Sequence, residues 1–332
     1  MIISRTPFRM SYVGGGTDLK SFFMEEPGAV VSTAINKYMF VNVHKKFDVG
    51  IRVAYSKTEE VKNVKDIEHP LVRESLKALS IDGGLEITSI ADIPAKGTGL
   101  GSSSSYTVGL LNSLHKFLKK DISLHKLAEF ACEIEIEKCK EPIGKQDQYA
   151  ATFGGLNLFE FLPDDSVNVL PISITDYFKK KLNESTIVFY TGNTRSASNI
   201  LKKQNINSKK TENKRSLRKM TNLAYQFKRD LENNDMLGLA ELLKENWSLK
   251  KNLTKDISNS SVDDIYNTAL NSGAIGGKLL GAGAGGFLMF LAPQEKHKKI
   301  KEALSNLRSF HFEIETLGSQ IVYSDTYTQL TE

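Results

Sequence analysis

The sequence is poor in cysteine, tryptophan and proline. Among 332 residues there are two cysteines, one tryptophan and eight prolines. Cys132 and Cys139 lie seven positions apart in one predicted helix, about two turns, and this separation is too long for a disulfide. A disulfide-stabilised scaffold is therefore excluded, and we expect reduced thiols in a cytoplasmic protein.

Long hydrophobic runs are also absent. The longest run, Phe287–Ala292, is far shorter than the roughly 20 apolar residues that a membrane-spanning helix needs. The first residues, Met1–Pro7, contain no apolar segment of signal-peptide length. Hydrophobic residues make up 40% of the chain and charged residues 25%, which is typical of a globular protein with a substantial core. We therefore expect a cytoplasmic protein that does not bind membranes.

The chain has no general excess of one charge, although its net charge is +5. Segment 202–219 contains eight Lys or Arg residues against one acid, Glu212, so it carries +7 and the remainder sums to −2. This segment lacks interleaved aromatic residues and any known nucleic-acid-reading module. We expect a solvated loop that leads into a charged helix, and no nucleic-acid partner.

Strand-like and helix-like patterns follow one another in irregular order. Period-two and β-branched patterns predict strands at 30–43, 49–55, 85–90, 153–161, 185–190, 278–280, 287–291, 310–317 and 321–323. Helical patterns lie at 104–118, 123–140 with Ser123 as N-cap, 214–232, 235–252, 262–272 and 294–307. This mixed order predicts an α+β fold, and the length favours two domains, 1–185 and 186–332.

Three glycine-rich segments stand out, at 14–16, 97–101 and 281–286. In the second, three glycines on alternate positions run into four serines, and a helical pattern starts at once behind them. Glycine lets backbone amides close around a ligand, and a helix N-terminus adds free N–H groups and a positive dipole end. The segment therefore predicts a phosphate cradle. A flexible Gly/Ser linker is the alternative, but apolar residues at helical spacing follow without a gap.

Two common phosphate motifs do not account for these segments. A Walker loop requires Gly-Lys-Ser/Thr, whereas Gly101 is followed by serine and Lys278 by leucine. Glycines 281, 283 and 286 match the dinucleotide pattern formally, but a strand-like run follows them where that motif needs a helix. The three segments together still indicate backbones that converge on a phosphate-rich ligand.

Three carboxylates are candidates for chemistry. Glu135 shares a helical stripe with Ala128 and Ala131, so it faces inward, where it could ligate Mg²⁺ beside a loop serine. Asp147 lies in the polar loop after that helix, and Asp18 follows the first glycine segment. The alternatives are a paired surface acid for Glu135 and turn or capping roles for the two aspartates.

In order and separation, the three segments resemble the signature motifs of the GHMP small-molecule kinases, and the resemblance covers nearly the whole chain. Its most specific part is Gly99-Leu100-Gly101-Ser102-Ser103. The resemblance implies a two-domain GHMP kinase fold, with a ribosomal-S5-domain-2-like N-terminal half and a ferredoxin-like C-terminal half. It also implies an ATP-dependent phosphotransferase with an alcohol as acceptor.

The same resemblance implies roles for individual residues. Ser103 and Glu135 match Mg²⁺ ligands, Asp147 matches the catalytic aspartate, and Arg9 matches an arginine that helps to acidify the acceptor hydroxyl. The residues expected at the ATP phosphates are Lys96, Gly97, Thr98, Gly99, Leu100, Gly101, Ser102, Ser103 and Ser104. Those expected at the acceptor are Gly15, Gly16, Thr17, Asp18, Arg195 and Gly283.

Two further patterns resemble sugar 1-kinases of the D-glycero-D-manno-heptose 7-phosphate type. They are R-x-P-x-R-x-x-x-x-G-G-G-T-D at 5–18 and Q-D-Q-Y-A-A-x-F-G-G at 146–155. This resemblance implies phosphorylation of the anomeric hydroxyl to give a 1,7-bisphosphate, in nucleotide-activated heptose biosynthesis. The alternatives are a fucokinase-like or galactokinase-like sugar 1-kinase and a catalytically silent GHMP-fold binding protein.

The acceptor is the open part of the prediction. Galactokinases carry Gly-Glu-His-Thr-Asp where this chain has Gly14–Asp18 with three glycines, and this difference argues against galactose. If the acceptor already carries a phosphate, a basic group must receive it. Candidates are Lys96, Lys145 and Arg195, with Arg195 preferred for its bidentate geometry. Solvent-exposed side chains are the alternative for the lysines, and the oligomeric state stays open between monomer and homodimer.

Overall fold

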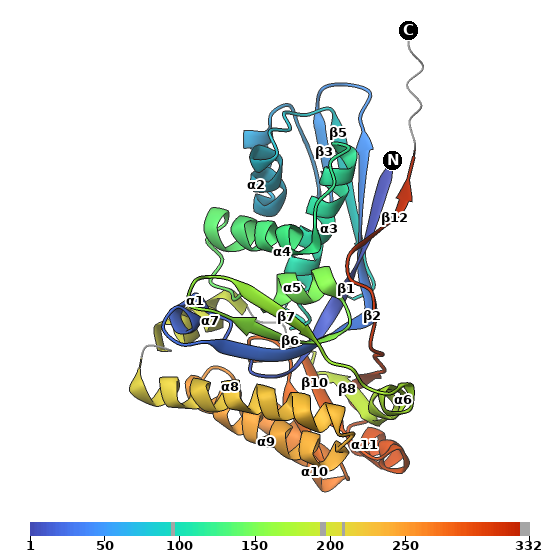
Figure 1. Ribbon diagram of the computed structural model, residues 1–332. Coiled ribbons are helices and arrows are strands. Elements are labelled where there is room, and N and C mark those ends of the chain that lie inside the picture. The colour runs from blue at the N-terminus through green and yellow to red at the C-terminus, as the bar shows by residue number, and fades with distance from the viewer. Residues whose placement is uncertain (94–96, 193–196, 208–209, 326–332) are drawn as a thin grey trace.

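The computed structural model describes residues 1–93, 97–192, 197–207 and 210–325, and Lys96 and Arg195 lie outside these ranges. Two β-sheets organise the chain (Figure 1). The larger contains β1 (Ile2–Val13), β2 (Gly28–Lys45), β3 (Ile51–Ala54), β4 (Thr58–Val61), β5 (Leu85–Ala91), β6 (Leu156–Phe161), β7 (Val167–Pro171) and β12 (Gln320–Ser324). The smaller contains β8 (Thr186–Tyr190), β9 (Gly276–Leu279), β10 (Phe287–Leu291) and β11 (Arg308–Phe310).

The helices lie on these two sheets. The N-terminal half contains α1 (Lys20–Phe23), α2 (Pro70–Ala78), α3 (Ser102–Phe117), α4 (Leu124–Cys132), α5 (Gln146–Phe153) and α6 (Asp176–Ser185), with a 3₁₀ turn at Val64–Asp66 and a π-helix at Glu133–Lys138. The C-terminal half contains α7 (Ala197–Asn207), α8 (Thr211–Glu232), α9 (Met236–Leu253), α10 (Ser260–Asn271) and α11 (His297–Ala303), with a 3₁₀ turn at Gln294–Lys296. In Figure 1, α2, α3 and α4 flank the upper strands, while α8, α9 and α10 lie at the lower end.

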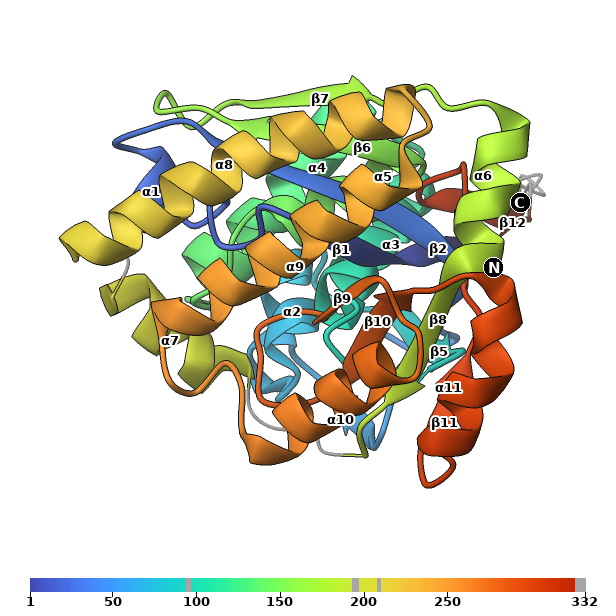
Figure 2. The same ribbon diagram turned by 90° about the horizontal axis from the view of Figure 1, so that it is seen from below.

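The long strand β2 joins the parts of the larger sheet. Its first half pairs with β6 and its second half with β5, and β1 runs antiparallel along nearly its whole length. The strand order is β12-β1-β2-β5-β3-β4; β6 also pairs with β2, and β7 pairs with β6. Figure 2 shows α8 and α9 running side by side across these strands. The long helices therefore cover the face of the sheet near its junction with the smaller sheet.

The sequence did not predict β1 as a strand, because polar residues interrupt its apolar pattern. Ser4, Thr6, Arg9 and Ser11 are all buried. The Ser4 hydroxyl donates to the Gly109 carbonyl of α3 at 2.8 Å, so the hydroxyl is hydrogen bonded inside the core. A core strand with buried polar side chains of this kind cannot be identified from hydrophobic periodicity.

Three expected elements differ from the structure. Residues 146–148, around the Asp147 that was expected in a polar loop, and Phe153, expected as the start of a strand, belong instead to helix α5, whose first turn carries Asp147. Of the strand expected at 310–317, only β11 up to Phe310 is a strand; the rest is irregular apart from a bridge between Ile35 and Ile314. The helix expected at 294–307 ends at Ala303. The mixed α+β character agrees with the expectation.

The change from the larger to the smaller sheet falls between β7 and β8, where the sequence suggested a boundary. The chain then returns, because β12 pairs with β1 in the larger sheet. The division into 1–185 and 186–332 stays a prediction, and the final strand belongs physically to the N-terminal sheet.

The basic segment at 202–219 spans parts of α7 and α8. Helix α8 buries the apolar stripe of Leu217, Met220 and Phe227. On its outer face, Lys214 forms an ion pair with Glu25 and Arg218 with Glu26. Part of the positive charge is therefore neutralised locally, and the helix has the charged outer face of an amphipathic helix.

Candidate active site

The three glycine-rich segments meet at one cleft of about 660 Å³. The cleft is lined by residues from β1, from the start of α3, from the loop before α5, from α9 and from the turn after β9. The predicted site residues that line it are Arg9, Gly15, Gly16, Asp18, Gly97, Thr98, Gly99, Gly101, Ser102, Ser103, Ser104, Asp147 and Gly283. The folding of the chain thus brings most of the predicted site into one place.

Helix α3 begins at the floor of this cleft. Its N-cap is Gly101, whose positive φ of 74° is favourable only for glycine and which offers no side chain to cap the helix. The first amides of an α-helix have no intrahelical partners, and the helix dipole makes this end positive. The start of α3 therefore has the geometry of an anion-binding site.

The second and third glycine segments pack directly against each other. A Cβ atom added to Gly99 would lie 2.3 Å from the Leu280 carbonyl oxygen, and one added to Gly281 would lie 2.4 Å from the Gly99 Cα. Both distances are far below van der Waals contact, so these positions require glycine for close backbone approach. The turn after β9 thereby fixes the loop that precedes α3.

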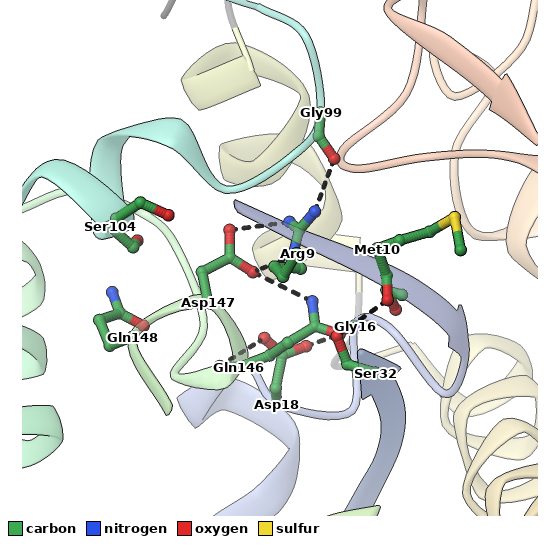
Figure 3. Close-up of polar contacts among 12 residues, drawn as sticks. Arg9, Met10, Gly16, Asp18, Ser32, Gly99, Ser104, Gln146, Asp147 and Gln148 are labelled. Atoms are coloured by element: carbon green, nitrogen blue, oxygen red, sulfur yellow. Dashed lines mark hydrogen bonds and ion pairs between the residues drawn. The ribbon is translucent and has the colours of Figure 1, made fainter. Parts of the chain in front are cut away.

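Arg9 and Asp147 form a bidentate ion pair within the cleft. Arg9 Nε donates to Asp147 Oδ1 at 2.7 Å, and Nη2 donates to Oδ2 at 2.8 Å. Arg9 Nη1 also donates to the Gly99 carbonyl at 2.6 Å, so the guanidinium links the aspartate to the glycine loop (Figure 3). Asp147 lies in the first turn of α5, where the helix dipole favours a carboxylate.

Glu135 is fully buried beneath the serines of α3, as its place on the helical stripe predicted. Its carboxylate accepts hydrogen bonds from Ser103 Oγ at 2.8 Å, Ser104 Oγ at 2.7 Å and Gln148 Nε2 at 2.5 Å. Burial raises the pKa of Glu135 to about 7, although these three hydrogen bonds act in the opposite direction. Glu135 sits in the π-helix at Glu133–Lys138, a distortion often found at functional sites.

Asp18 is held beside the loop that leads to α5. Its carboxylate accepts from the Gly16 amide at 2.8 Å and from the Gln146 amide at 3.4 Å (Figure 3), and burial raises its pKa. A Cβ atom on Gly144 would lie 2.0 Å from Asp18 Oδ2. Glycine at 144 is thus what leaves room for this buried carboxylate.

Two lysines that the motifs did not indicate also line the cleft, Lys250 of α9 and Lys278 of β9. Both are buried, and burial lowers the pKa of Lys250 to about 8 and that of Lys278 well below its ordinary range. Lys250 continues the buried stripe of α9 formed by Leu239, Leu243 and Trp247. A lysine on an otherwise apolar helical stripe is the signal that could have identified it.

Several predicted residues have other surroundings. Thr17 does not line the cleft; its hydroxyl donates to the Gly14 and Ala29 carbonyls, so it stabilises the turn. The Leu100 side chain is packed in the core. Lys145 forms an ion pair with Asp165 at 2.6 Å and lines a different cavity of about 430 Å³. The predictions for Lys96 and Arg195 fall outside the described residues.

Within the described ranges, no group of three or more His, Cys, Asp or Glu side chains could hold a metal ion. None of the described helices is both long and apolar enough to cross a membrane. The described site is a glycine loop at a helix start beside a carboxylate fixed by an arginine, an arrangement suited to a phosphotransferase.

Comparison with known proteins agrees with this class. The family model "GHMP kinases N terminal domain" matches residues 64–155, and "GHMP kinases C terminal" matches residues 227–308. The chain belongs to the GHMP kinase family, whose members are ATP-dependent phosphotransferases. Its two-domain fold is the fold of that family.

Individual relatives are sugar kinases. The chain is 32% identical to D-glycero-alpha-D-manno-heptose 7-phosphate kinase of Campylobacter jejuni, over 90% of this chain and 92% of the relative. It is 26% identical to a galactokinase of Pyrococcus furiosus, over 91% and 92% of the two chains. A crystal structure described as a D-glycero-D-manno-heptose 1-phosphate kinase from Bacteroides thetaiotaomicron superposes with a TM-score of 0.81 at 24% identity, covering 98% of this chain and 100% of that one. This protein is a sugar kinase of the GHMP family.

Proposed function

We propose that the protein transfers the γ-phosphoryl group of ATP to the anomeric hydroxyl of D-glycero-D-manno-heptose 7-phosphate, giving the 1,7-bisphosphate. The observation that carries the proposal is the bidentate pair of Arg9 and Asp147 beside the start of α3. The resemblance in sequence to a heptose 7-phosphate kinase supports the choice of acceptor. Because this chemistry uses ATP and both cysteines are free thiols, we place the protein in the cytoplasm.

Asp147 acts as the group that orients and deprotonates the acceptor hydroxyl. Asp147 Oδ1 accepts from Arg9 Nε and, at 3.2 Å, from Gln146 Nε2, whereas Oδ2 accepts from Arg9 Nη2 and keeps a lone pair for the substrate. Its side chain is 24% exposed while that of Arg9 is 5% exposed, so the aspartate faces the cleft and the arginine supports it. Arg9 also stabilises the negative charge that develops on the attacking oxygen.

The ATP phosphates lie over the loop from Gly97 to Gly101 and the first turn of α3. Phosphoryl transfer depends mainly on positioning and on neutralising charge, and the amides at a helix start supply both. The transfer forms a bond from the acceptor oxygen to the γ-phosphorus and breaks the bond to the bridging oxygen of ADP. The hydroxyl proton passes to Asp147.

Ser103 and Glu135 have the donor set that Mg²⁺ prefers. Ser103 Oγ and Glu135 Oε1 are hydrogen bonded at 2.8 Å, and these two oxygens would hold the ion. The carboxyl group is hydrogen bonded to neutral donors only, so a cation bound there would favour its charged form. When bound there, Mg²⁺ would neutralise charge on the ATP phosphates.

The test is turnover of wild type and of Asp147→Asn. Wild-type protein should consume ATP with heptose 7-phosphate and give a product in which phosphorus couples to the anomeric proton in NMR. Asp147→Asn should lower kcat by roughly 10²- to 10⁴-fold and leave the affinity for an ATP analogue unchanged. Asp164→Asn, at an exposed site between β6 and β7, is the matched control.

A panel of acceptors separates the alternatives. Turnover with fucose or galactose at higher kcat/KM than with heptose 7-phosphate would make the protein a different sugar 1-kinase. ATP-analogue binding without turnover on any sugar or sugar phosphate would instead fit a silent binding protein. Near-normal turnover by Asp147→Asn would remove the assignment of the base.

A further inference from the structure

One end of the cleft contains hydrogen-bond donors that lack acceptors. Lys250 and Lys278 line it with only 8% and 5% of their surfaces exposed. In the described part of the chain, neither lysine forms an ion pair with a carboxylate. Asp18, which lines the same cleft, attracts Lys250 electrostatically but forms no ion pair with it. Buried ammonium groups without a paired carboxylate are costly, and two of them at one cleft indicate a site for an anion.

The contacts of these lysines are all with neutral oxygens. Lys250 Nζ donates to the Gly15 carbonyl at 2.7 Å and lies 3.4 Å from Gln204 Oε1. Lys278 Nζ donates to the Ser11 carbonyl at 2.9 Å. Each ammonium carries three N–H groups, so each keeps at least one for a ligand.

Two further donors lie beside them. Ser11 Oγ and Gln204 Nε2 are buried and have no hydrogen-bond partner among the described residues. A Cβ atom on Gly16 would lie 2.3 Å from Gln204 Nε2 and 3.2 Å from Lys250 Nζ, so Gln204, which does not itself line the cleft, lies directly behind the cleft-lining Gly16. Ser11, Gln204, Lys250 and Lys278, which we call the donor cluster, therefore offer polar hydrogens from four side chains.

We propose that the donor cluster binds a phosphate monoester carried by the acceptor substrate. This inference rests on the proposed function, in which the acceptor is a sugar phosphate. A phosphate monoester carries a charge of roughly −1.5 to −2 near pH 7 and three terminal oxygens, which suits two cations and two neutral donors. A carboxylate, with one charge and two oxygens, would leave a lysine uncompensated.

The position of the donor cluster fits a substrate that reaches the reacting groups from this end. Arg9 and Ser11 alternate along β1 and both line the cleft, so they lie about 6.7 Å apart on one side of the strand. Arg9 holds Asp147, while the Ser11 carbonyl accepts from Lys278. The donor cluster thus takes the place of Lys145 as the candidate group for the acceptor phosphate, because Lys145 is paired with Asp165 at another cavity.

The experiment compares Lys250→Met and Lys278→Met with Lys251→Met. Lys251 is the neighbouring residue on α9, is 34% exposed and pairs with Asp263, so it controls for loss of a lysine from this helix. Calorimetric titrations use inorganic phosphate, mannose 6-phosphate and mannose as probes, and a non-hydrolysable ATP analogue as reference. Thermal melts of the unliganded proteins report folding.

We expect each cluster variant to bind mannose 6-phosphate about 10- to 100-fold more weakly than wild type, with binding of mannose and of the ATP analogue unchanged. The unliganded variants should melt at the same temperature as wild type or higher, because methionine removes a buried charge. Lys251→Met should bind all probes like wild type. Stability that rises while phosphate affinity falls is a pattern that a structural lysine would not produce.

Two outcomes overturn the inference. The first is that both cluster variants bind mannose 6-phosphate as tightly as wild type does. The second is that they lose affinity for the ATP analogue as much as for mannose 6-phosphate, which would place the nucleotide at the donor cluster. The proposed function fails separately. If heptose 7-phosphate is not a substrate but phosphate binding still depends on the two lysines, the inference stands. If heptose 7-phosphate is a substrate with unchanged KM in both variants, only the inference is lost.

Discussion

Replacing Glu135 by glutamine should make the protein more stable at alkaline pH. In the folded protein this carboxylate is buried with only neutral donors around it, and its pKa is raised from 4.5 to about 7. The folded state therefore holds the proton more tightly than the unfolded state does. Between these two pKa values the folded state binds more protons, so wild-type stability falls as pH rises.

The size of the effect follows from that shift. One pKa unit corresponds to about 1.36 kcal/mol. Relative to low pH, where Glu135 is protonated in both states, its titration lowers the wild-type free energy of unfolding by roughly 1 kcal/mol at pH 5 and roughly 3 kcal/mol at pH 8. The glutamine side chain does not titrate, so this loss disappears in Glu135→Gln. Gln148 Oε1, which is buried without a partner among the described residues, can accept from the new amide if the Gln148 side chain flips. The stability difference between variant and wild type should thus grow by about 2 to 3 kcal/mol from pH 5 to pH 8.

Urea denaturation followed by far-ultraviolet circular dichroism, at several pH values without Mg²⁺, measures this difference. The other titrating groups are the same in both proteins, so their contributions to the pH dependence of stability cancel in the difference. Glu137→Gln is the control, because Glu137 lies two residues away, is 51% exposed and pairs with Lys20 at 3.3 Å. A stability difference for Glu135→Gln that stays constant from pH 5 to pH 8 would refute the reasoning. Because Glu135 is also the proposed Mg²⁺ ligand, the more stable variant should lose turnover.

Two further changes probe the cleft. Gly144→Ala places a Cβ atom 2.0 Å from Asp18 Oδ2, so we expect a raised KM for the acceptor and a lower melting temperature, with the affinity for an ATP analogue kept; an unchanged KM would mean that Asp18 does not contact the acceptor. Arg9→Lys cannot form the bidentate contact, so kcat/KM should fall by about 100-fold in steady-state assays. An unchanged kcat/KM would show that a positive charge at position 9 is sufficient for catalysis and that the bidentate contact with Asp147 is not needed.

The glycine segments were readable from the sequence because their structure is local. Gly97, Gly99 and Gly101 lead into a helix whose first residue follows directly, and the exposed amides of a helix start need no distant partner. The inward orientation of Glu135 was likewise predictable, since a helical stripe depends only on spacing along one helix. The family could therefore be named from these motifs, and the comparisons confirm it.

The contacts between segments could not be read in this way. Arg9 and Asp147 are 138 positions apart, and their pairing depends on how β1 and α5 pack around β2. The strand β1 itself was hidden by its buried polar residues, which only the packed structure explains.

The sequence by itself determined the family, through its motifs, and predicted a phosphate-binding loop, because glycine spacing and a helix start are local features. The tertiary structure decided which charged side chains share the cleft. It brought in Lys250 and Lys278, paired Lys145 with Asp165 at another cavity, and fixed Thr17 in a turn. The physical reason is that burial and charge pairing depend on sheet register and helix packing, which join residues far apart in the chain.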